Sequence, residues 1–113
     1  MSRFDPNLDR LFQALSDPTR RAVLARLSAG PVTASELAEP FDMALPSFLE
    51  HLRKLEDGGL IETRKEGRVR WCALKPGALA PARDWMEEQR ALWTARLDNL
   101  EDYLARLMKD RQK

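Results

Sequence analysis

The chain has 113 residues, with 19 lysines and arginines against 18 aspartates and glutamates, one histidine and one cysteine. This length fits one compact domain, and a single cysteine excludes a disulfide framework within the chain. No apolar run is long enough to span a membrane, and residues 1–6 lack the apolar core of a signal peptide, so we expect a cytoplasmic protein.

The same composition argues against an enzyme. Only His51 could act as the base of a histidine-dependent triad, and the sequence has no glycine-rich phosphate loop or nucleophile turn. One histidine and one cysteine do not supply the ligands of a Cys/His zinc site within one chain. We therefore expect no catalytic residues, no cofactor and no metal ligands.

Two helices are predicted at the start of the chain. Apolar residues at helical spacing predict the first helix over residues 7–15. Asp17-Pro18 then has the form of an N-cap followed by proline in the first turn. The second helix that begins there is expected to end at Gly30-Pro31.

Residues 33–58 are predicted to form a helix-turn-helix. Thr33 and Glu36 have the spacing of a capping box, and the short helix that they begin must end by Pro40. A longer helix follows, from about Leu45 to Gly58. Its buried face is predicted from three apolar residues at four- and three-residue spacing, Phe48, Leu52 and Leu55.

The pattern then changes to that of a β-hairpin. Residues 60–65 and 69–74 flank Gly67, and a glycine between two such runs is typical of a tight turn. A hairpin after a helix-turn-helix is a wing. The predicted fold is therefore mainly α, a winged helix-turn-helix with a two-stranded β-wing over about residues 60–75.

A long helix is predicted over about residues 82–110. Without a break from Arg83 to Asp110 it would span ~42 Å, and a domain of this size cannot cover so long an apolar stripe. We expect a second copy of the chain to cover it in a homodimer. We interpret its aromatic residues as packing residues rather than an effector pocket. The stripe residues predicted for the interface are Trp85, Leu92, Trp93, Leu97, Leu100, Tyr103, Leu104 and Leu107.

Charge is distributed unevenly along this nearly neutral chain. Residues 31–62 carry two basic and seven acidic side chains, whereas residues 63–83 carry six basic and one acidic. A basic segment this short favours a local contact with an anion.

Three segments stand in order along the chain: residues 11–21 (LFQALSDPTRR), 45–61 (LPSFLEHLRKLEDGGLI) and 65–70 (KEGRVR). Together they resemble the ArsR/SmtB family of bacterial winged-helix transcriptional regulators, over about residues 7–107. The resemblance implies that the helix over residues 45–58 enters the DNA major groove. It also implies repression of a small operon, relieved by a small-molecule effector. Finally, it implies a dimer formed by the first and last helices, which adds three first-helix residues to the interface, Leu8, Leu11 and Phe12.

The chain departs from the metal sensors of this family. Where those carry a Cys-x-Cys pair, this chain has residues 36–41 (ELAEPF), and its last helix offers Asp84 and Glu88 without a histidine. The closer likeness, carried by residues 85–104, is to members without metal ligands. Metal sensing is therefore not expected.

DNA-binding side chains are expected at the helix-turn-helix and in the wing. Wing arginines and lysines suit phosphate or minor-groove contacts. A leucine can meet a thymine methyl and a glutamate can accept from cytosine N4, but the two leucines, Leu45 and Leu49, equally fit a role in capping the core. Thr33 either donates to phosphate or caps its helix. The full predicted set is Thr33, Leu45, Pro46, Ser47, Leu49, Glu50, Arg53, Lys54, Arg64, Lys65, Arg68 and Arg70.

His51 and Cys72 are interpreted as structural. His51 has no visible co-ligand, and a bond to backbone or phosphate would account for it. Cys72 is expected to be a buried, inert thiol, with thiol sensing as the alternative because Arg70 is nearby.

The predicted function is that of a homodimeric, sequence-specific DNA-binding repressor. Two copies of the helix over residues 45–58 would enter successive major grooves of a pseudo-palindromic operator. The whole chain, residues 1–113, is taken as one winged-helix DNA-binding domain. The alternative is a winged helix that docks a protein and not DNA, which the acidic balance of residues 31–62 and the leucines also fit.

Overall fold

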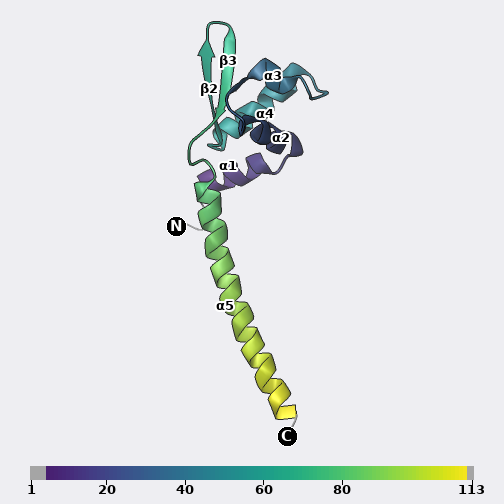
Figure 1. Ribbon diagram of the computed structural model, residues 1–113, viewed down its shortest axis with the longest axis vertical. Helices are drawn as coiled ribbons and strands as arrows, with labels where there is room; N and C mark the ends of the chain where they lie inside the picture. The colour runs from purple at the N-terminus through teal and green to yellow at the C-terminus, as the bar shows by residue number, and fades with distance from the viewer. Residues whose placement is uncertain (1–4, 112–113) are drawn as a thin grey trace. The chain divides into compact units, whose positions relative to one another are not determined.

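The computed structural model describes residues 5–111 (Figure 1). Contacts divide them into two compact units, the winged-helix unit (residues 5–82) and the C-terminal unit (residues 83–111). No helix in this part of the chain is long and apolar enough to cross a membrane. The elements in chain order are α1 (Pro6–Leu15), α2 (Pro18–Leu27), β1 (Val32–Thr33), α3 (Ala34–Ala38), α4 (Leu45–Asp57), β2 (Ile61–Glu66), β3 (Val69–Leu74) and α5 (Ala80–Arg111).

Side-chain caps set the start of two helices. The Asp17 carboxylate accepts a hydrogen bond from the backbone N–H of Arg20 at 3.1 Å, at the start of α2. Thr33 Oγ1 accepts from the backbone N–H of Glu36 at 3.2 Å, at the start of α3. Each cap satisfies an N–H that has no partner within its helix, a contribution of about 1 kcal/mol. The predicted caps at Asp17 and Thr33 are confirmed.

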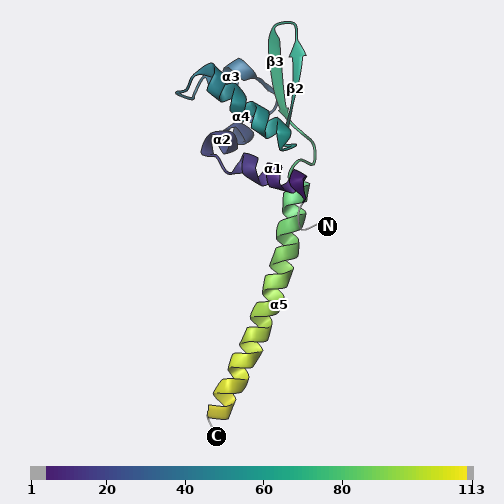
Figure 2. The same ribbon diagram turned by 180° about the vertical axis from the view of Figure 1, so that it is seen from behind.

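The sheet contains one strand more than predicted. Strands β2 and β3 form the expected antiparallel hairpin, whose tip projects past the helices of the winged-helix unit (Figure 2). Gly67 lies in its turn with φ 63°, a left-handed conformation that favours glycine. Strand β1 pairs with the other edge of β3, with Val32 opposite Cys72, so the strand order is β1-β3-β2. Two residues are too few to show an alternating pattern, and for this reason the sequence did not reveal β1.

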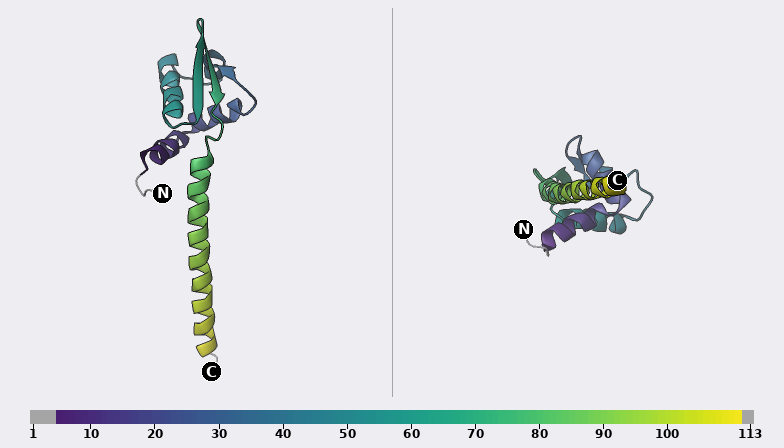
Figure 3. Two further views of the ribbon diagram at one scale, coloured as in Figure 1. Left: turned by 90° about the vertical axis from the view of Figure 1, so that its left-hand side faces the viewer. Right: turned by 90° about the horizontal axis from the view of Figure 1, so that it is seen from below.

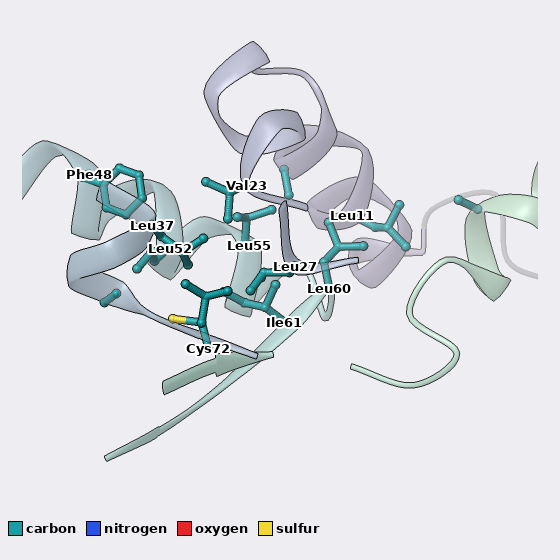
Figure 4. Close-up of a cluster of buried hydrophobic side chains, with 14 residues drawn as sticks. Leu11, Val23, Leu27, Leu37, Phe48, Leu52, Leu55, Leu60, Ile61 and Cys72 are labelled. Carbon is teal, nitrogen blue, oxygen red and sulfur yellow. The ribbon is translucent and has the colours of Figure 1, made fainter. Parts of the chain in front are cut away.

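The core lies between the helices and the inner face of the sheet. Figure 4 shows the α4 side chains among those of α2 and β2. The predicted stripe on α4, Phe48, Leu52 and Leu55, is confirmed, since none of these side chains exceeds 1% exposure. The winged helix-turn-helix class is confirmed as well.

Two residues predicted for the dimer interface are already buried in the single chain. Leu8 is 9% and Leu11 3% exposed in the single chain, so α4 and its neighbours already cover them. Phe12, the third, is partly buried and packs against the same core. Helical spacing identifies an apolar face but not the surface that covers it, so the assignment of Leu8 and Leu11 to the dimer interface stays a prediction.

Helix α5 runs unbroken from Ala80 to Arg111 (Figure 3). Its first turn contributes Ala82 to the core of the winged-helix unit. Within the C-terminal unit the apolar side chains are exposed, from Trp85 at 37% to Trp93 at 68%. The exposed set is Trp85, Met86, Leu92, Trp93, Leu97, Leu100, Tyr103, Leu104, Leu107 and Met108.

Candidate nucleic-acid interface

Helix α4 has one buried face and one face in solvent. Leu45 is 53% exposed, whereas Leu49 is half-buried and packs against the core. The two leucines that the sequence left open thus differ: Leu49 helps to cover the core and Leu45 does not. The other predicted α4 residues are exposed: Pro46, Ser47, Glu50, Arg53 and Lys54.

Arg53 is held by two carboxylates of its own helix. Its Nε donates to Glu50 Oε2 at 3.0 Å and its Nη2 donates to Glu50 Oε1. Its Nη1 donates to Asp57 Oδ2 at 3.1 Å. The hydrogen bond from Arg53 lowers the pKa of Glu50, and the reciprocal interaction raises the pKa of Arg53. The exposed face of α4 therefore carries a guanidinium whose charge is already matched.

Behind α4, Arg20 is buried at 6% exposure. Its Nε donates to Ala14 O at 2.8 Å and its Nη2 to Gln13 O at 2.9 Å, both at the end of α1. Its Nη1 lies 3.0 Å from His51 Nδ1 on α4. A guanidinium can only donate, so Nδ1 accepts and the ring hydrogen resides on Nε2. One side chain thus fastens α4 to α1 and α2.

Asp17 completes this group. Its carboxylate lies 3.7 Å from His51 Nδ1. Burial alone would raise the pKa of Asp17, but the hydrogen bonds from the backbone N–H groups of Arg20 and Thr19 and the positive charge of Arg20 outweigh it, so the pKa is lowered. His51 Nδ1 bonds to the Arg20 side chain and not to backbone, which fits a structural role; a phosphate contact of His51 stays a prediction.

Sequence reasoning missed Arg20, although a signal was present. Arg20 precedes Val23 and Leu27 by three and seven residues. The spacing that marks those two residues as buried places Arg20 on the same face of α2. A charged residue on a buried stripe requires partners, and the carbonyls at the end of α1 supply them.

The wing presents its basic residues to solvent. Lys65 and Arg70 are directly opposite each other in the β2–β3 register, and like charges at such a position repel each other unless an anion lies between them. Arg64 lies 3.7 Å from Glu66, which leaves its charge partly matched. The four predicted wing residues are all exposed: Arg64, Lys65, Arg68 and Arg70.

A hydrogen bond connects the wing to α4. Thr63 Oγ1 on β2 donates to Glu56 Oε2 at 3.1 Å in the last turn of α4. At the end of α4, a Cβ added to Gly58 would lie 3.0 Å from Ala14 Cβ and 3.0 Å from Arg10 O. This close approach fixes the end of α4 against α1. Together with the Thr63–Glu56 hydrogen bond, it fixes the position of α4 relative to the wing.

Thr33 and Cys72 have roles within the fold. The Thr33 hydroxyl oxygen is engaged in the α3 cap. Cys72 is fully buried, and its burial raises the pKa of the thiol, so the expected burial of this residue is confirmed. Among residues 5–111 no three histidine, cysteine, aspartate or glutamate side chains gather as a metal-ligand group.

Comparisons with known proteins place this architecture in a family. A family model described as a helix-turn-helix domain matches residues 15–64. The chain is 34% identical to the transcriptional repressor SdpR of Bacillus subtilis, over 70% of this chain and 88% of that protein. It is 37% identical to the HTH-type transcriptional regulator Rv2034 of Mycobacterium tuberculosis, over 79% of this chain and 80% of that one.

A solved structure agrees with these relatives. The crystal structure of an ArsR family transcriptional regulator, RHA00566, matches with a TM-score of 0.78 and 55% identity, over 83% of this chain and 97% of that one. These proteins are described as transcriptional regulators, so the prediction of a regulator rather than an enzyme is confirmed. The chain belongs to the ArsR/SmtB family of winged-helix, DNA-binding transcriptional regulators.

Proposed function

We propose that this regulator is a homodimeric repressor that occupies a pseudo-palindromic operator and so blocks transcription of a small operon. The observation that carries the proposal is the exposed face of α4, which a hydrogen bond connects to an exposed basic wing. The N-terminal residues of a recognition helix reach base edges in the major groove, while basic side chains nearby bind phosphate. The relative SdpR is itself described as a repressor.

In this proposal the site residues divide by position. Leu45, Ser47 and Glu50 lie in the first half of α4 and contact base edges, with Pro46 beside them. Five cations contact the sugar-phosphate backbone: Lys54, Arg64, Lys65, Arg68 and Arg70. Arg53 meets the DNA together with its partner Glu50. Thr33 and Leu49 support these contacts from the α3 cap and the core.

The dimer in this proposal forms through α5. Its exposed apolar side chains lie at spacings of three, four and seven residues, and an apolar stripe of that kind is stable in water only when another surface covers it. Two copies related by a dyad would place two α4 helices in successive major grooves. The mass of one chain is 13.0 kDa, and sedimentation equilibrium should give twice this value. A monomer at micromolar concentration would contradict the dimer.

Release of the operator by a small-molecule effector completes the proposal. Such a repressor meets its operator and its effector in the cytoplasm. Asp84 and Glu88, the carboxylates of the last helix at the place where metal sensors of this family keep ligands, are exposed and belong to no metal-ligand group within residues 5–111, so the proposed effector is not a metal ion.

Fluorescence anisotropy tests the function directly. Purified protein is titrated into labelled duplex from the DNA upstream of its own gene, at two salt concentrations, with unrelated duplex as competitor. We expect salt-dependent binding that the unrelated duplex fails to displace. Equal competition by unrelated DNA would contradict an operator in that region. Exposed Leu45 would then favour the second candidate, a winged helix that docks a protein.

A further inference from the structure

We infer that Glu50 is a specificity-determining residue that acts through Arg53. By holding the guanidinium in an intrahelical ion pair, it withholds this cation from the phosphates of unrelated DNA. The pair opens only at a base pair that satisfies both groups. This inference rests on the proposed function, since it assumes that α4 faces DNA.

The geometry of the pair supports this role. Nε and Nη2 of Arg53 donate to the two oxygens of the Glu50 carboxylate, in a bidentate arrangement. The same edge of a guanidinium binds phosphate, or O6 and N7 of guanine. While the pair is intact, Arg53 cannot present this edge to DNA. Asp57 occupies Nη1 at 3.1 Å, on the other side of the guanidinium.

Charge makes the exchange unfavourable on unrelated DNA. Glu50, Arg53 and Asp57 together carry a net charge of minus one on the exposed face of α4. If Arg53 left Glu50 for a phosphate, one anionic partner would replace another, and the freed carboxylate would face a polyanion. Arg53 therefore contributes little to binding at random sites.

A G·C base pair changes this balance. Guanine offers O6 and N7 to Arg53, while the paired cytosine offers its N4 amino group to Glu50. Both side chains then have hydrogen-bond partners. The pair thus favours an operator with a G·C pair under the middle of α4, where Glu50 and Arg53 lie one turn apart.

Glu50→Gln tests the inference, because it keeps the size of the side chain and removes the charge that holds Arg53. Anisotropy titrations of the full-length variant with unrelated duplex should show binding about three- to tenfold tighter than wild type at ~0.1 M salt. The slope of log affinity against log salt should steepen by about 0.9, the value for one additional phosphate contact. The preference for the upstream DNA should fall accordingly.

The same substitution in an Arg53→Met background separates this mechanism from simple charge repulsion. If Glu50 acts through Arg53, the gain on unrelated DNA disappears in that background. A gain that persists there, or no gain in the single variant, would overturn the inference. Glu87→Gln is the matched control, since Glu87 and Arg90 form the same i,i+3 pair on α5; its affinity should equal that of wild type.

The two failures are distinguishable. Wild-type binding to upstream DNA that unrelated duplex displaces equally would contradict the proposed function. If the wild type binds upstream DNA selectively but Glu50→Gln binds unrelated duplex with wild-type affinity, only the role of Glu50 is overturned.

Discussion

Arg20 Nη1 on α2 lies 3.0 Å from His51 Nδ1 on α4. The same guanidinium donates to two backbone carbonyls at the end of α1, Ala14 O and Gln13 O. Through these bonds the orientation of α4 depends on a buried charge and not only on apolar packing. The exposed face of α4, which we propose to contact DNA, is thus positioned from the buried side of the helix.

Arg20→Met should destabilise the protein. Methionine fills much of the volume but donates no hydrogen bond, so two carbonyls and His51 Nδ1 lose their partner. Loss of charged hydrogen bonds at a buried site costs about 2–4 kcal/mol of unfolding free energy. Urea denaturation at fixed protein concentration measures it. Arg26→Met, on the exposed part of the same helix, is the control and should stay within about 0.5 kcal/mol of wild type.

Asp17→Asn should remove a pH-dependent part of the stability. Asparagine retains the cap, but the negative charge beside Arg20 and the helix N-terminus is lost, at a cost of about 0.3–1 kcal/mol near neutral pH. Because the folded-state pKa of Asp17 lies below its ordinary value of 3.8, its contribution is complete above that value and is lost as the pH falls through the folded pKa. Denaturation curves from pH 7 to pH 3 should therefore converge at the acidic end. A constant difference across that range would contradict the assignment.

Arg68→Ala and Arg70→Ala should weaken binding to every DNA sequence alike. Phosphate contacts carry no sequence information, and each one lost should flatten the slope of log affinity against log salt by about 0.9. Titrations of operator and unrelated duplex at several salt concentrations measure both quantities. Weaker binding to the operator alone would assign the arginine to base recognition instead.

Cys72 should be unreactive in the folded protein. Its side chain is fully buried, and burial raises the pKa of the thiol, so little thiolate is present near neutral pH. Labelling with a chromogenic disulfide reagent should be slow in buffer and complete within minutes in concentrated urea. Fast labelling of native protein, accompanied by loss of DNA binding, would support the thiol-sensing alternative.

Local signals predicted much of the winged-helix unit. The Asp17 and Thr33 caps, the buried stripe of α4 and the glycine turn of the wing each depend on residues close in sequence. Such interactions can be recognised from spacing alone. For this reason the helix-turn-helix and the hairpin agree with the structure.

The features that were missed depend on contacts between distant residues. Strand β1 exists because Val32 meets Cys72 across the sheet, and Arg20 is satisfied only because α1 and α4 converge on it. Leu11 is buried by its own unit, although its spacing suited an interface equally well. The Glu50–Arg53 pair could have been predicted, since charge pairs at i,i+3 spacing can be recognised in a sequence. Its bidentate geometry could not.

The central claim is that a dyad-related dimer places two α4 helices on one face of the operator. Hydroxyl-radical footprinting of the upstream DNA tests it most directly. We expect two protected half-sites related by dyad symmetry, with centres about 10 base pairs or a multiple of that apart. A single protected block without symmetry, or uniform protection along the duplex, would contradict it.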